Sequence, residues 1–112
     1  MESGTVDYSP DSWVVLKVKA GKGTFPFYKV LAGWSGGPWS ATWRINSGIN
    51  LVFDREDEIH LYGESGSLYR CPKEAYGLRM STAGVYKDLC LQQEFGGQIQ
   101  LMPEDTNWME LL

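Results

Sequence analysis

Short apolar runs alternate with glycine-rich turns through the first third of the chain. Residues 13–19 are rich in valine and carry two lysines on one face, and residues 27–32 form a second apolar run. A Gly-Lys-Gly turn separates the two runs, which predicts an antiparallel hairpin. Residues 41–46 follow a loop rich in tryptophan and glycine and predict a short third strand.

The middle of the chain has the pattern of a β-meander. We expect its three strands over residues 49–53, 58–62 and 67–71, separated by an acidic turn and a glycine turn. Apolar residues alternate in the first of these strands, so Ile49, Leu51 and Phe53 are predicted to lie on one face.

A helix is predicted in the last third of the chain. It runs from Ser81 or Thr82, either of which is a suitable N-cap, to about Glu94, before two glycines. Residues 98–101 predict a late strand, and Asp105 is expected to cap a final helical turn. The apolar residues of that turn are expected to dock on the domain: Trp108, Met109, Leu111 and Leu112.

Together these elements predict an α+β, β-dominated fold. It consists of an antiparallel meander of five to six strands, one helix packed on it and a C-terminal helical turn. Residues 1–11 lack such a pattern and are predicted to form a disordered lead, so residues 12–112 make up a single β-rich domain. A chain of 112 residues has room for one modest core.

Charge and composition narrow the functions that fit. The net charge is −4 and the ten Lys and Arg are spread along the chain, so a nucleic-acid partner is not expected. The sequence shows neither an apolar run of the ~18 residues that span a membrane nor a signal-peptide pattern, which predicts a cytoplasmic protein without a membrane partner. Cys71 and Cys90 give no metal-site spacing, so no metal or cofactor is expected.

One segment is similar to a catalytic motif. Gly33-Trp34-Ser35-Gly36-Gly37 matches the G-x-S-x-G nucleophile elbow and follows a predicted strand. An elbow leads into a helix, whereas this segment continues into a Gly-Pro loop. A Ser35–His60 pair stays open as an alternative, but the chain is predicted not to be an enzyme.

The strongest binding signal lies between Gly33 and Gly48, where three tryptophans stand among small residues. Indole rings stack on planar groups, and arginine or exposed backbone amides can hold a phosphate or carboxylate. We expect Trp43 in the core and Trp39 in a binding site, while Trp34 fits either. The predicted binding residues, including a second polar-aromatic group further along, are Trp34, Ser35, Gly36, Trp39, Arg44, Asn46, Tyr62, Arg70 and Arg79.

Four segments of the chain resemble a known group of proteins: residues 28–37, 43–49, 75–80 and 102–109. They are similar to small uncharacterised accessory proteins of tailed bacteriophages. The turn Gly33-Trp34-Ser35-Gly36 is also similar to the Gly-Trp-Asn-Gly turn of anti-Thoeris sponge proteins, with serine in place of asparagine. The resemblance implies a phage protein that acts in the cytoplasm of a host bacterium, in counter-defence or host takeover.

Two hypotheses about function follow. In the first, the chain binds and sequesters a nucleotide-like small molecule without turning it over, in a pocket completed across a homo-oligomer. In the second, it inhibits a host protein through an exposed Trp/Arg surface or through an acidic surface such as residues 54–58.

Overall fold

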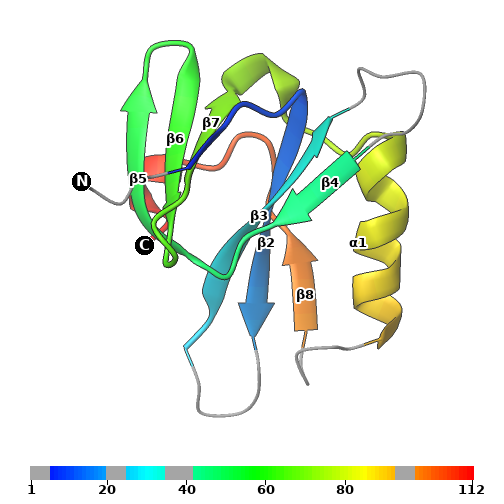
Figure 1. Ribbon diagram of the computed structural model, residues 1–112. Helices are drawn as coiled ribbons and strands as arrows, with labels where there is room; N and C mark the ends of the chain where they lie inside the picture. The colour runs from blue at the N-terminus through cyan, green and yellow to red at the C-terminus, as the bar shows by residue number, and fades with distance from the viewer. Residues whose placement is uncertain (1–5, 20–24, 35–41, 93–97) are drawn as a thin grey trace.

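Two β-sheets and one helix form three layers in the described part of the chain (Figure 1). The structure is a computed structural model that describes residues 6–19, 25–34, 42–92 and 98–112. In chain order its elements are β1 (Asp7–Tyr8), β2 (Ser12–Lys19), β3 (Phe27–Trp34), β4 (Thr42–Ile45), β5 (Ile49–Arg55), β6 (Glu58–Gly63), β7 (Leu68–Pro72), η1 (Lys73–Ala75), α1 (Met80–Gln92), β8 (Gln98–Leu101) and η2 (Trp108–Glu110).

The first sheet has the strand order β1-β7-β6-β5, and the second has the order β4-β3-β2-β8. The predicted hairpin is β2–β3 and the predicted meander is β5–β6–β7, so both are confirmed. The β-dominated α+β class is also confirmed. The expected single meander of five to six strands is wrong, because eight strands of the described residues divide between two sheets.

β2 explains why two sheets are needed. Trp13 and Val15 point into the layer between the sheets, while Val14 and Leu16 point toward α1, and all four are buried. A strand that is apolar on both faces must be covered on both faces. The first sheet covers one face of β2 and α1 covers the other (Figure 1).

The N-terminal residues that were expected to be disordered include a strand. Asp7 and Tyr8 pair in parallel with Leu68 and Tyr69 of β7, and the ring of Tyr8 stacks on that of Tyr69 with centroids 4.9 Å apart. The prediction of a disordered lead over residues 1–11 is therefore wrong for Asp7 and Tyr8, which form β1. Residues 1–5 lie outside the described residues. A strand of two residues has no periodicity that a sequence pattern could reveal.

A β-bulge changes the predicted face of β5. The pairing of β5 with β6 shifts register between Ile49 and Leu51. Ile49 is 6% exposed in the core, whereas Leu51 and Phe53 are 52% and 39% exposed on the opposite face. The expectation that these three residues share a face is wrong, because one extra residue in a strand reverses the side on which the following side chains lie.

The helix α1 begins earlier than predicted. Thr82 was a candidate N-cap, but it lies within the first turn, where its hydroxyl accepts a hydrogen bond from the Arg79 N–H (3.0 Å). The Thr82 N–H donates in return to the Arg79 carbonyl (3.0 Å), so the two residues close the helix start reciprocally. Val85, Tyr86 and Leu89 pack against the second sheet.

The C-terminal turn docks as predicted, with half of its apolar residues inside. Trp108 and Leu111 are buried between the sheets, while Met109 and Leu112 are exposed. The predicted cap at Asp105 is not formed, because the short helix η2 starts after Asn107 and has no side-chain cap.

Candidate functional site

One face of the first sheet is turned away from the second sheet and from α1 (Figure 1). Cross-strand pairing places its side chains opposite one another across β5, β6 and β7. We call this the outer sheet face. Its members that reach the solvent are Leu51, Phe53, Arg55, Glu58, His60, Tyr62 and Arg70.

The apolar part of the outer sheet face is contributed by β5 and β6. The edge of the Phe53 ring faces the Tyr62 ring with centroids 5.8 Å apart, and the Arg55 guanidinium lies 5.4 Å from the Phe53 centroid. Leu51 is opposite Tyr62 and more than half exposed. Aromatic and arginine side chains that are in contact but still exposed are typical of protein-binding surfaces.

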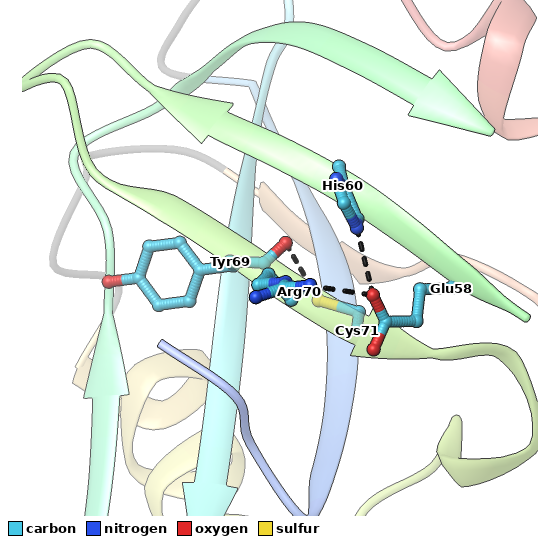
Figure 2. Close-up of polar contacts among 5 residues, drawn as sticks. All are labelled: Glu58, His60, Tyr69, Arg70 and Cys71. Carbon is cyan, nitrogen blue, oxygen red and sulfur yellow. Dashed lines mark hydrogen bonds and ion pairs between the residues drawn. The ribbon is translucent and has the colours of Figure 1, made fainter. Parts of the chain in front are cut away.

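The polar part of the outer sheet face is organised by Glu58. Figure 2 shows His60 and Arg70 directed toward its carboxylate, with His60 Nε2 at 2.8 Å and Arg70 Nε at 3.7 Å from Glu58 Oε1. Three neighbouring strand positions therefore bring a carboxylate, an imidazole and a guanidinium together. The contact with Glu58 fixes the orientation of the His60 imidazole, whereas the Arg70 guanidinium stays partly exposed.

A second aromatic cluster lies where β1 and β7 meet β3 and β4. Tyr8 stacks on Tyr69, its ring meets that of Trp34 edge-on with centroids 6.1 Å apart, and the Arg44 guanidinium lies 4.7 Å above it. Trp34 Nε1 donates to the Ser9 carbonyl (3.0 Å). Trp34, which was open between core and site, is thus partly buried and held by the fold, while Arg44 is exposed.

Burial controls the ionisation of the groups beneath these two surfaces. Burial raises the pKa of Tyr69 to about 12, although the positive charge of Arg44 acts in the opposite direction. Burial also raises the pKa of the Cys71 thiol, and the Glu58 carboxylate adds to this effect. Both groups are therefore neutral at physiological pH, and Cys71 is an unreactive core thiol.

Two residues of the tryptophan-rich segment, residues 33–48, do not have the roles predicted for them. Trp43 was expected in the core but is 49% exposed, because it lies on the edge strand β4 opposite Gly33, which has no side chain to cover it. Asn46 was expected in the binding site but is 6% exposed. Its Oδ1 accepts from the Val30 N–H (2.9 Å) and its Nδ2 donates to the Gly48 carbonyl (3.2 Å), so it holds the turn before β5.

The remaining predicted residues do not form one site. Tyr62 and Arg70 lie together on the outer sheet face, whereas Arg79 is at the start of α1, which packs on the other sheet. A single anionic ligand shared by Arg70 and Arg79 is therefore not supported by the geometry. Ser35, Gly36 and Trp39 lie outside the described residues.

The structure adds residues that were not among the predicted binding residues: Tyr8, Leu51, Phe53, Glu58 and His60. His60 was considered only as a partner of Ser35, and Glu58 only as part of the acidic run over residues 54–58. A usable signal existed for Leu51 and Phe53. In residues 58–62, apolar Ile59 and Leu61 alternate with polar residues, so these two apolar side chains face the core. In the neighbouring strand of the hairpin, the residue opposite Leu61 is Val52, which therefore also faces the core. That pairing leaves Leu51 and Phe53 outside.

Within the ranges that the structure describes, His, Cys, Asp and Glu form no group of three or more that could hold a metal ion. In the same ranges, no helix has both the length and the apolar character required to cross a membrane. Comparisons of the chain with protein-family models, with curated proteins and with solved structures gave no significant match.

Proposed function

We propose that this chain is a non-enzymatic binding protein that captures another protein through the outer sheet face. The observation that supports this proposal is the exposure of Leu51 and Phe53 on a sheet face bordered by Arg55 and Arg70. The resemblance to phage accessory proteins would make the captured protein a component of the host bacterium. Inhibition by occupying the partner's surface requires no catalytic group on this chain.

Simple energetics favour a macromolecular partner for this face. Full burial of a leucine or phenylalanine side chain contributes about 1.5–3 kcal/mol. About half of that remains to be gained at Leu51, which is 52% exposed, and about two-fifths at Phe53, which is 39% exposed. Tyr62, Arg55 and Arg70 of the same face belong to residue types, tyrosine and arginine, that dominate protein-binding hot spots.

Photocrosslinking tests the proposal at Phe53. We expect a chain carrying benzoylphenylalanine in place of Phe53 to form a discrete crosslinked species in a bacterial lysate. The same substitution at Leu91, which is 71% exposed on α1, should not form that species. With the crosslinked partner purified, Phe53→Ala should raise the dissociation constant about three- to sevenfold, the loss expected from the exposed part of its side chain.

Leu91→Ala is the matched control, since it removes an apolar side chain that is even more exposed than Phe53 and lies in another layer. Both variants should retain the wild-type circular dichroism spectrum. Equal crosslinking from positions 53 and 91, or equal affinity of Phe53→Ala and wild type for the crosslinked protein, would contradict the proposal.

A nucleotide-like ligand at Arg44 is the second candidate function. It is favoured by the exposed guanidinium of Arg44, which is stacked on Tyr8 beside Trp34 and is available to an anion. Trp43 and Arg44 are adjacent on β4 and therefore point to opposite faces, so they cannot enclose one ligand between them.

Thermal-shift measurements with cyclic dinucleotides and ADP-ribose derivatives test this second candidate. A ligand of this class should raise the melting temperature of the wild type, because it binds the folded state. Arg44→Gln should lose at least half of the rise, whereas Arg55→Gln should keep it. A flat response of the wild type across the panel would exclude sequestration of these nucleotides.

A further inference from the structure

The first sheet ends at β5, and the outer edge of this strand is unpaired. β5 has β6 on one side and no strand of the described residues on the other (Figure 1). From Asn50 to Arg55 its residues are exposed, except for Val52, which is partly buried. An unpaired strand edge presents a row of backbone N–H and C=O groups that can pair with another chain.

The hydrogen bonds between β5 and β6 determine which backbone groups point outward. In an antiparallel pair, every second residue exchanges hydrogen bonds with the neighbouring strand. The Glu64 N–H donates to the Gly48 carbonyl (2.9 Å), which fixes this alternation for the two strands. The β5 residues whose backbone groups pair with β6 are then Leu51, Phe53 and Arg55. The backbone groups of Val52 and Asp54 point away from β6, and the described residues give them no backbone partner.

β5 is also the least protected of the four sheet edges in the described part of the chain. β1 has two residues and β4 and β8 have four each, whereas β5 has seven. Proteins commonly protect an edge strand by making it short or by placing lysine or proline in it, and β5 contains neither residue type. Its bulge lies before Leu51, so residues 51–55 are regularly paired and present a straight edge.

We propose that the captured protein adds an extended strand to the first sheet along β5, an inference that rests on the function proposed above and specifies the form of the partner. The added strand forms backbone hydrogen bonds with Val52 and Asp54. Its alternate side chains lie on the outer sheet face beside Leu51, Phe53 and Arg55. The matching segment has apolar residues next to the first two and a carboxylate next to the arginine. In antiparallel pairing it reads acidic-x-apolar-x-apolar.

The surroundings of Arg55 favour a strand of another protein over a second copy of this chain. In the described residues its guanidinium lies over the Phe53 ring, while its cross-strand neighbour Glu58 is engaged by two other side chains. When two β5 strands pair by two-fold symmetry, every register that aligns the outward backbone groups places Arg55 opposite an apolar residue: Ile49, Leu51 or Phe53. The net charge of −4 on each copy adds long-range repulsion. A strand of another protein can place a carboxylate opposite Arg55.

Amide hydrogen exchange measured by NMR tests the proposal. In the free chain the amides of Val52 and Asp54 should exchange rapidly, and that of Phe53 slowly, because only the last is hydrogen-bonded to β6. The probe is the acetylated and amidated peptide Thr-Glu-Lys-Phe-Val-Leu-Thr at up to about 1 mM. It should slow exchange at Val52 and Asp54 by about threefold or more. The amide of Trp43, which points outward from the edge strand β4, should not change.

Two matched controls separate backbone pairing from side-chain contacts. The same peptide N-methylated at its lysine and valine, whose amides face β5 in the antiparallel register, should not bind. Replacement of the peptide glutamate by glutamine should weaken binding to the wild type by about threefold and should not weaken binding to Arg55→Gln.

Four results overturn the proposal. They are slow exchange of Val52 and Asp54 in the free chain, protection that grows with protein concentration as in self-pairing, no binding of the peptide at about 1 mM, and equal binding of the N-methylated peptide. A protein that crosslinks to position 53 but leaves these two amides in fast exchange also overturns it, while the proposed function stands. Peptide binding with the expected protection, but without a crosslinked protein, supports the open edge and contradicts the proposed function.

Discussion

Replacement of Trp13 by alanine is expected to lower the free energy of unfolding by about 3–5 kcal/mol, the cost of removing a large aromatic core side chain. Trp13 is 1% exposed and contacts residues from the middle and from the C-terminal end of the chain. Its ring centroid is 4.7 Å from that of Tyr76 and 5.3 Å from that of Trp108, and its Nε1 donates to the Pro72 carbonyl (2.6 Å). Its loss opens a cavity and leaves a partly buried carbonyl without its donor.

Urea denaturation followed by far-ultraviolet circular dichroism measures this effect without relying on tryptophan fluorescence. Because small domains have a stability of only about 5–15 kcal/mol, the variant should be partly unfolded at moderate urea concentrations. Trp43→Ala is the matched control and should cost about 1 kcal/mol or less, because Trp43 is half exposed at the edge of a sheet. Equal costs for the two substitutions would contradict the assignment of Trp13 to the core and of Trp43 to the surface.

Asn46→Ala is expected to lower the free energy of unfolding by about 1–3 kcal/mol, because it leaves the buried Val30 N–H without a partner. The Gly48 carbonyl loses one of its two hydrogen bonds and keeps the one from the Glu64 N–H (2.9 Å). The side-chain amide accepts from the Val30 N–H and donates to the Gly48 carbonyl, connecting β3 to the turn before β5. Leucine or aspartate at this position would not replace both bonds, since neither side chain both accepts and donates at neutral pH.

Asn50→Ala provides the comparison, because Asn50 is exposed on β5 four residues further along. We expect it to change stability by no more than about 0.5 kcal/mol in urea denaturation. If Asn46→Ala kept wild-type stability and lost partner or nucleotide binding instead, Asn46 would be a binding residue and the structural role described above would be wrong.

The sequence by itself determined the local elements of this protein. The hairpin over β2–β3, the meander over β5–β7, the helix α1 and the late strand β8 each have enough periodic pattern to be predicted. It also pointed to Tyr62, Arg70 and Arg44, which the structure places on exposed surfaces or in contact with other aromatic rings. These features depend on side chains that are close in sequence.

Only the tertiary structure decided which face of each strand is covered. A single bulged residue moved Leu51 and Phe53 from the face that Ile49 occupies, which they were predicted to share, to the outer sheet face, and an edge position exposed Trp43. The short strand β1 brought Tyr8 under Arg44, and two backbone partners buried Asn46. The physical reason is the same in each case. Burial depends on which segments pair and pack across the chain, and that pairing is set by the sum of long-range contacts and not by the pattern within one strand.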